Sequence, residues 1–170
     1  MPSECTLRDM TSADLELVLN WRNSPVVRTK MFNQQEITEE QHQDWFVNAS
    51  ADFHHKLLIV QEDVPFGFVQ FKNVQNGGVV EWGFFVDPEA PRGSGIKLGC
   101  AALNYAFVTL KVHKICGQAL QSNHASVAFH KRLGFVQEGL LRQQKIVDDV
   151  YHTIVCFGLL KNEWNRGKQQ

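Results

Sequence analysis

The sequence predicts an α/β fold in which helices lie against a mixed sheet. Strand-like and helix-like segments follow one another in the order strand, helices, three strands, helix, strand, helix and a closing pair of strands. The three consecutive strands indicate an antiparallel meander. With 170 residues, of which 44% are apolar, the chain suits one well-filled hydrophobic core. We therefore expect one domain over residues 1–164 and a flexible tail over residues 165–170.

The first half of the chain contains a strand, two helices and the meander. A short strand over residues 5–10 leads into Thr11–Asp14, which opens a helix that ends near Pro25. Thr38–Gln41 has the form of a capping box and predicts the start of a second helix. The strands of the meander are expected over residues 56–61, 66–74 and 79–86.

The second half alternates helices and strands. A loop of small residues over 89–95 leads into an apolar-periodic helix over residues 96–110. The remaining segments predict a strand, a helix and a closing pair of strands over residues 114–120, 125–133, 135–141 and 150–160.

Composition argues against several classes of function. Seventeen basic residues against eighteen acidic ones leave a net charge of -1, which indicates neither a nucleic-acid partner nor an anionic membrane surface. The amino terminus lacks the pattern of a secretory signal, and no apolar stretch is long enough to span a bilayer. We expect a soluble cytoplasmic protein without metal sites or disulfides, because the cysteines lie far apart in the chain as Cys5, Cys100, Cys116 and Cys156.

The segment Pro91–Ile96 lies between a predicted strand and a predicted long helix. Free backbone N–H groups at a helix start converge on an anion, and the helix dipole favours negative charge there. Gly93 and Gly95 allow a ligand to approach closely, although they would equally permit a tight turn without any ligand. A Rossmann site is disfavoured because a third glycine and an acidic ribose-binding residue are missing, and a Walker A site because no Gly-Lys-Ser/Thr follows.

A second segment, Asn123–Phe135, also follows a predicted strand. Asn123 can cap the next helix or reach a bound ligand, and Ser126 lies in the first helical turn, where the dipole favours anions. Gly134 ends the helix.

The two segments resemble the signatures of the GNAT family of N-acetyltransferases. The first resembles Arg/Gln-x-x-Gly-x-Gly/Ala, with Arg92 and Gly95 at the first two fixed positions and Lys97 departing from the third. The second resembles Asn-x-x-Ala/Ser-x-x-x-Tyr-x-Lys-x-Gly-Phe. The resemblance covers about residues 7–164 and implies the GNAT fold, which is a mixed, mostly antiparallel central sheet splayed in the middle with helices on both faces. It implies acetyl-CoA as co-substrate, held by Phe85, Val86, Arg92, Gly93, Ser94, Gly95, Ile96, Lys97, Asn123, Ser126, Phe129 and Arg132.

His130 and Glu81 are the candidate catalytic residues. The resemblance places His130 where the family usually has a tyrosine that protonates the departing thiolate, a role worth about two to four powers of ten in rate. A histidine could donate that proton, with a rate that depends on pH near its ordinary pKa of about 6.5, or it could only pack or contact the coenzyme. Glu81 could take a proton from the acceptor ammonium or simply face solvent, and Gly83 suits the bulge that the family has in this strand. Because no cysteine lies in a signature segment, we expect direct attack in a ternary complex.

The amino-terminal half is expected to choose the acceptor. Its arginines, histidine and aromatic rings suit a nucleotide-linked substrate better than a polyamine, which asks for carboxylates. These stretches resemble the N-acetyltransferases of the pseudaminic-acid pathway, which acetylate the 4-amino group of a UDP-linked 4-amino-4,6-dideoxy sugar used for flagellin and surface glycans. That resemblance implies Arg22 and His42 near the diphosphate and Trp45 beside uracil, with Met31 and Phe85 around the 6-methyl group of the sugar.

Other acceptors and states are open at this point. A related acetyltransferase of ribosomal-protein amino termini or of polyamines would share both coenzyme segments. A chain that binds the coenzyme but has lost turnover would share them too. The protein could be a monomer or a homodimer.

Overall fold

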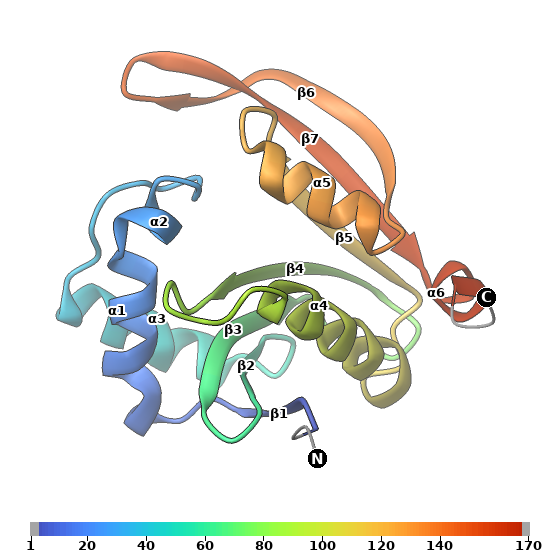
Figure 1. The fold of residues 1–170 in the computed structure, drawn as a ribbon, viewed down its shortest axis with the longest axis horizontal. Coiled ribbons are helices and arrows are strands. Elements are labelled where there is room, and N and C mark those ends of the chain that lie inside the picture. The colour runs from blue at the N-terminus through green and yellow to red at the C-terminus, as the bar shows by residue number, and fades with distance from the viewer. Residues whose placement is uncertain (1–3, 168–170) are drawn as a thin grey trace.

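The computed structural model describes residues 4–167, which form a seven-stranded sheet in the order β1-β2-β3-β4-β5-β7-β6 (Figure 1). The strands are β1 (Thr6–Asp9), β2 (Lys56–Gln61), β3 (Pro65–Lys72), β4 (Val79–Val86), β5 (Lys114–Leu120), β6 (Val136–Val147) and β7 (Val150–Leu160). The predicted α/β class and the order of its elements are confirmed.

The sheet is antiparallel except between β4 and β5, which run parallel. These two strands pair only over Val79↔Lys114, Val80↔Ile115 and Glu81↔Cys116. Beyond that point β4 continues to Val86 and β5 to Leu120 without pairing with each other, and Figure 1 shows the two strands diverging. The predicted sheet, mostly antiparallel and splayed in the middle, is therefore confirmed.

Helices cover both faces of the first four strands. Side chains alternate along a strand, so each strand packs against the helices on both faces. Leu58 and Val60 of β2 pack in the cluster that contains Leu98 and Phe107, whereas the intervening Ile59 packs in the cluster that contains Met10, Val18 and Trp21. The helical elements are η1 (Ser12–Asp14), α1 (Leu15–Asn23), α2 (Pro25–Arg28), α3 (Glu39–Ala51), α4 (Ser94–Asn104), η2 (Tyr105–Thr109), α5 (His124–Arg132) and α6 (Lys161–Gly167). None of the helices within residues 4–167 has the length and apolar character needed to span a membrane.

Local capping signals place two helices that frame the site. Thr38 Oγ1 accepts a hydrogen bond from the Gln41 N–H at 3.2 Å, and the Thr38 N–H donates to Gln41 Oε1 at 3.0 Å. The predicted capping box is thus present, and α3 begins at Glu39. Asn123 Oδ1 accepts from the Ser126 N–H at 3.2 Å and caps α5.

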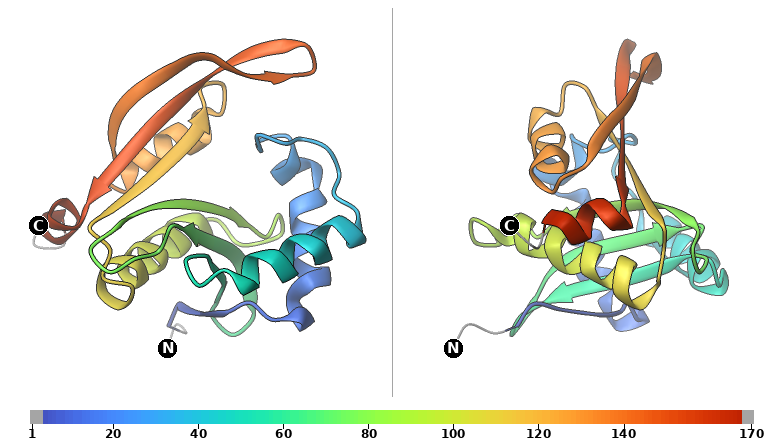
Figure 2. Two further views of the ribbon diagram at one scale, coloured as in Figure 1. Left: turned by 180° about the vertical axis from the view of Figure 1, so that it is seen from behind. Right: turned by 90° about the vertical axis from the view of Figure 1, so that its right-hand side faces the viewer.

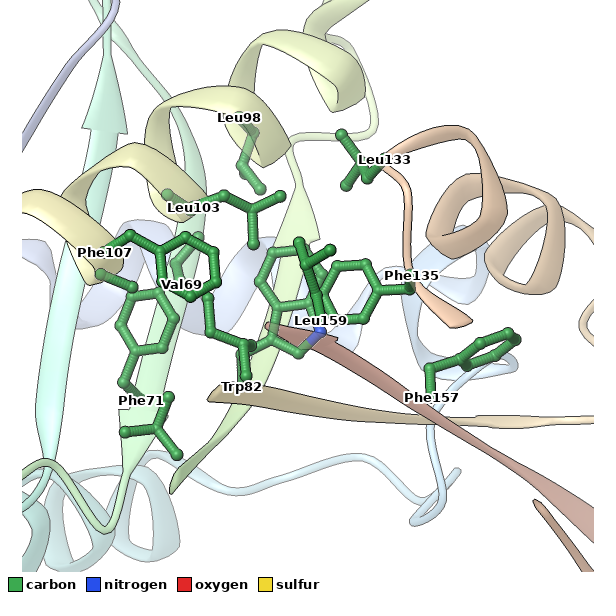
Figure 3. Packing of buried hydrophobic residues seen from close by; sticks show 14 of the residues in the cluster. Val69, Phe71, Trp82, Leu98, Leu103, Phe107, Leu133, Phe135, Phe157 and Leu159 are labelled. Atoms are coloured by element: carbon green, nitrogen blue, oxygen red, sulfur yellow. The ribbon is translucent and has the colours of Figure 1, made fainter. Parts of the chain in front are cut away.

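Trp82 of β4 connects the two halves of the splayed sheet. Figure 3 shows its ring among side chains from α4, from β3 and from the closing strand pair. It stacks on Phe135 with ring centroids 5.2 Å apart, and it lies 4.6 Å from the ring of Phe84. The core therefore runs continuously beneath the point where the strands separate.

The structure differs from the sequence prediction in several elements. The helix predicted over 96–110 begins earlier, at Ser94, and changes pitch at Tyr105 into the π-helical turn η2. The register between β3 and β4 passes Gly83 without a shift, so the expected bulge is not there. Helix α6 runs to Gly167, so the predicted tail of 165–170 begins inside a helix, and residues 168–170 lie outside the described part.

The closing hairpin is longer than predicted. Strand β6 continues to Val147 rather than ending at residue 141, and it joins β7 through Asp148 and Asp149. Both turn residues have positive φ, 48° and 61°, which matches a two-residue turn that follows the twist of the strands. Figure 2 shows this curved hairpin extending beyond α5.

Candidate active site

A cleft of about 1280 Å³ opens where β4 and β5 separate. Because side chains alternate along β4, the cleft has two sides. On one side the ring centroids of Phe84 and Phe129 of α5 are 5.0 Å apart. On the other side those of Phe85 and Phe68 are 5.1 Å apart, and the Phe68 ring meets Trp45 of α3 edge-on. We call these the coenzyme side and the acceptor side.

The coenzyme side includes the start of α4, where Gly93 is the N-cap residue with φ 93°. The Ser94 N–H donates to the Pro91 carbonyl, whereas the amides of Gly95 and Ile96 lie in the first turn, where helix geometry provides no partner. A Cβ at Gly95 would meet only the Phe129 ring, at 3.9 Å, and one at Gly93 would meet nothing within 4 Å. The open amides and the positive end of the helix fit a diphosphate group.

The residues predicted to hold the coenzyme fall into two groups. Those that line the cleft are Phe85, Val86, Ser94, Gly95, Asn123, Ser126 and Phe129. Those that lie outside its lining are Arg92, Gly93, Ile96, Lys97 and Arg132. Gly93 and Ile96 still shape the cleft, because their backbone forms the start of α4.

Lys97 is held away from the cleft. Its Nζ lies 2.6 Å from Glu62 Oε1 in the turn between β2 and β3. The side chain that departs from the family pattern therefore ties α4 to that turn.

We expect Lys97→Met to change the affinity for coenzyme A by less than about threefold, because Lys97 Nζ pairs with Glu62 and the residue lies outside the cleft lining. Isothermal titration of coenzyme A into the variant and the parent protein checks this. A loss of tenfold or more would mean that Lys97 leaves Glu62 to bind the coenzyme.

His130 lies on the coenzyme side and is buried, with 1% of its surface exposed. The Trp82 Nε1–H donates to His130 Nε2 at 3.1 Å, so Nε2 is the acceptor and carries no hydrogen. The hydrogen is then on Nδ1, which donates to the Ser126 carbonyl at 2.8 Å. Burial lowers the pKa of His130, and the bond to Ser126 offsets this only in part. The expectation of a proton donor at His130 conflicts with this arrangement, because the neutral ring has no free hydrogen.

Because two histidines are buried, we expect the free energy of unfolding to fall at mildly acidic pH. Burial is the main cause that lowers the pKa of both His42 and His130. In the unfolded chain these rings titrate near about pH 6.5. Below that pH the unfolded state takes up protons that the folded state does not bind, so stability present above about pH 6.5 is lost as the pH falls through the lowered pKa values.

Thermal unfolding measured between about pH 7.5 and about pH 5.5 tests this. The midpoint should drop in the parent protein, should drop less in His130→Phe, and should drop as in the parent in His113→Gln, whose side chain is exposed. Equal pH dependence in His130→Phe and the parent would contradict the assignment.

Glu81, Gly83 and Gln70 lie together on the acceptor side. Glu81 is exposed to the cleft, where a carboxylate can meet an acceptor amine. Gln70 pairs with Gly83 across the strands, and its Oε1 lies 2.8 Å from His55 Nε2. Sequence reasoning did not select Gln70 or Trp82, although the register of the meander could have placed Gln70 opposite Gly83.

Arg22 of α1 is a buried cation on the acceptor side. It is 9% exposed, and its Nη2 donates to the Asn33 carbonyl at 2.6 Å, while the buried Nη1 has no hydrogen-bond partner. Burial lowers the pKa of Arg22, and the charge of Arg28 lowers it further. Among the side chains of residues 4–164, no carboxylate forms an ion pair with Arg22.

His42 of α3 lies beside this cation. It is 5% exposed, its Nε2 is buried without a hydrogen-bond partner, and its ring stacks on Trp45 with centroids 5.2 Å apart. All the predicted acceptor residues line the cleft, namely Arg22, Met31, His42, Trp45 and Phe85. The acceptor side thus presents the unpaired Arg22 Nη1–H next to a stacked aromatic ring.

No group of three or more side chains within the described chain is arranged to hold a metal ion. The cysteines are all free. Cys116 and Cys156 line the cleft, and burial raises the pKa of the Cys116 thiol, which disfavours the nucleophilic thiolate.

Comparison with known proteins identifies relatives of this arrangement. Residues 4–136 match the family model for the acetyltransferase (GNAT) domain. The chain is 31% identical over 104 residues to the putative ribosomal N-acetyltransferase YdaF of Bacillus subtilis, a match that covers 60% of this chain and 57% of that protein. It is 25% identical over 128 residues to the acetyltransferase PseH of Campylobacter jejuni, covering 75% of this chain and 80% of that protein.

Among solved structures, the chain resembles the spermidine N-acetyltransferase from Vibrio cholerae in complex with CoA and spermine. The TM-score is 0.87 at 21% identity, and the match covers 95% of this chain and 98% of that one. At this identity the likeness concerns the fold.

Proposed function

The chain belongs to the acetyltransferase (GNAT) family, and from this premise we propose that it acetylates the amine of a small acceptor that also carries phosphate. It is an acetyl-CoA-dependent N-acetyltransferase, and acetyl-CoA is its co-substrate. The acceptor that we propose is a UDP-linked 4-amino-4,6-dideoxy sugar, acetylated at its 4-amino group.

The observation that carries this proposal is the uncompensated charge of Arg22. A buried cation is costly unless an anion or several hydrogen bonds compensate it. Arg22 has one hydrogen bond, to Asn33, and its Nη1 is unpaired. A diphosphate would supply the missing charge and an acceptor for Arg22 Nη1, and arginine suits phosphate because of its planar fork of donors.

The rest of the acceptor side suits the other parts of such a molecule. Trp45 stacks with His42 at the cleft wall and offers an aromatic face for a base ring. Met31 and Phe85 provide apolar surface for a methyl group of the sugar. A pocket of this kind discriminates a methyl group by about 1–3 kcal/mol, so the anion contacts provide most of the orientation.

The chain's contribution to catalysis is to position the two substrates and to exclude water. Acetyl-CoA supplies the activated acetyl thioester. Beyond Glu81, β4 has backbone groups that do not pair with β5, and these can bind an extended ligand arm as an added strand. Glu81 lies in the cleft lining where β4 and β5 stop pairing. It can take a proton from the acceptor ammonium, since only the neutral amine is nucleophilic.

A polyamine is the second candidate acceptor. The cleft lining contains the carboxylates of Glu81, Asp87 and Glu138, which would attract a polycation, and the similar Vibrio cholerae structure binds spermine. The charge of Glu138 is however neutralised by Lys114, whose Nζ lies 2.7 Å from Glu138 Oε1. The Bacillus subtilis relative makes a ribosomal-protein amino terminus a third class of acceptor to include in the assay.

Release of free thiol from acetyl-CoA, measured with a panel of amines, tests the proposal. We expect turnover with a UDP-linked amino sugar and little with spermidine or an amino-terminal peptide. UDP added to the coenzyme A complex should raise its thermal midpoint further. Turnover restricted to spermidine or to the peptide would replace the proposed acceptor, and coenzyme binding without any turnover would indicate a binding module.

A further inference from the structure

We propose that His130 is a positioning residue, not the proton donor, and that the proton needed by the departing sulfur comes from the attacking nitrogen. The inference concerns acetyl transfer itself and does not depend on the identity of the acceptor. It starts from a hydrogen bond at the vertex of the cleft.

The vertex is the point where β4 and β5 stop pairing. Glu81↔Cys116 is the last pair, and Trp82 and Gly117 are the next residues on the two strands. The Trp82 indole N–H donates to His130 Nε2, so this bond links β4 to α5 next to the vertex. A Cβ at Gly117 would lie 2.5 Å from His130 Nε2 and 2.7 Å from Trp82 Nε1, which shows that the bond passes directly beside the Gly117 backbone.

The surroundings of His130 hold its ring in one orientation. It stacks on Phe157 with centroids 4.7 Å apart and an interplanar angle of 5°, and Phe135 meets it edge-on at 5.1 Å. The rings of Phe84 and Phe129 complete the enclosure, at 5.9 and 6.1 Å. No charged side chain contributes to its pKa, which burial lowers. Turning the ring would break two hydrogen bonds, and protonating it would place a charge among aromatic rings.

The role that follows for His130 is to hold Trp82. With Nε2 as a fixed acceptor, the indole is kept against β5 and α5, and the wall of the cleft beside the reacting groups keeps its shape. A Trp82 released from this bond would leave a buried N–H unpaired, which costs about 1–3 kcal/mol, and it would be free to enter the cleft.

The proton balance closes without a side-chain acid at this position. The lone pair of the neutral amine forms a C–N bond to the acetyl carbon, the C–S bond breaks, and its electron pair stays on sulfur. The nitrogen sheds one proton and the sulfur gains one, which yields an amide and a thiol. Glu81 acts earlier, when it removes the extra proton of the ammonium group.

The first test is a nitrogen NMR spectrum of the ligand-free protein labelled with ¹⁵N-histidine. We expect His130 to be neutral at about pH 7, with hydrogen on Nδ1 and none on Nε2, and Trp82→Phe to shift the Nε2 signal. A hydrogen on Nε2, or a charged ring at that pH, would overturn the proposal. This readout is independent of the acceptor, so its failure is distinguishable from failure of the proposed substrate.

The second test compares two substitutions at the same position. A glutamine oxygen can accept from Trp82 in place of Nε2, whereas a phenyl ring cannot. We expect His130→Gln to keep kcat within about threefold and His130→Phe to lose about tenfold or more, as the loss of one buried hydrogen bond predicts. Equal, large losses in both variants would restore His130 as the acid.

The dependence of kcat on pH provides a further arm of this test. If His130 donates the proton, kcat falls as the pH rises above the pKa of His130, which burial places below its ordinary value of about 6.5. In our account kcat rises with deprotonation of the acceptor amine and shows no fall up to about pH 9. Gly117→Ala, which keeps both residues but places a Cβ against the two bonded nitrogens and forces them apart, should lower kcat as His130→Phe does. Parent-like kcat in Gly117→Ala would argue against a role for the Trp82–His130 bond.

Discussion

Replacing Arg22 with Met is expected to raise KM for a phosphate-bearing acceptor by at least about tenfold, while the ligand-free protein becomes no less stable. A hydrogen bond to a charged group contributes about 1.5–3 kcal/mol, which corresponds to about tenfold or more in affinity. In the free protein the same guanidinium is buried without a counter-ion, so its replacement by an apolar side chain of similar length removes a desolvation cost. The substitution also removes the hydrogen bond from Arg22 to the Asn33 carbonyl.

The matched control for Arg22 is Arg142→Gln, which removes an exposed arginine from the β6–β7 hairpin. Steady-state kinetics and thermal unfolding of both variants give the two readouts. Arg22→Lys should recover part of the affinity, because it keeps the charge but not the planar fork. An unchanged KM in Arg22→Met would remove the anion site, and improved turnover of spermidine would favour the polyamine alternative.

Replacing Gly95 with Val is expected to weaken coenzyme A binding by about a hundredfold, the equivalent of losing two charge-assisted hydrogen bonds. A Cβ at this position meets only the Phe129 ring, at 3.9 Å, so the folded chain accommodates a Cβ there. The added methyl groups would occupy the space over the open amides at the start of α4, where we place the diphosphate. Calorimetric titration with coenzyme A measures the loss.

Gly139→Val is the matched control for this change, because a Cβ at Gly139 meets nothing within 4 Å and Gly139 is in β6. It should bind coenzyme A as the parent protein does. Both variants should unfold within a few degrees of the parent. Parent-like coenzyme affinity in Gly95→Val would place the diphosphate elsewhere.

Much of the architecture was predictable because its signals are local. The capping box at Thr38 and the cap at Asn123 each involve residues three apart, and both are present. The divergence of β4 and β5 followed from the family resemblance, since nothing local marks where parallel pairing ends. The π-helical turn at Tyr105 and the full length of β6 were missed because packing, not periodicity, determines pitch and length there.

The candidate site was predictable in position but only partly in chemistry. The residues predicted to bind the acceptor all line one cleft, yet the missing counter-ion of Arg22 is evident only once the neighbouring segments are folded around it. The contact between Trp82 and His130 joins residues 48 positions apart, and no sequence pattern encodes it. The same holds for Lys97, whose partner Glu62 is 35 positions away. Side-chain roles that depend on such partners need the structure.

A crystal structure of the protein with coenzyme A bound tests the central claim most directly. The account predicts the diphosphate on the backbone amides of Gly95 and Ile96, and the thiol arm between β4 and β5 beyond Glu81. A coenzyme bound outside this cleft, or strands that close together along their length once it binds, would contradict the account.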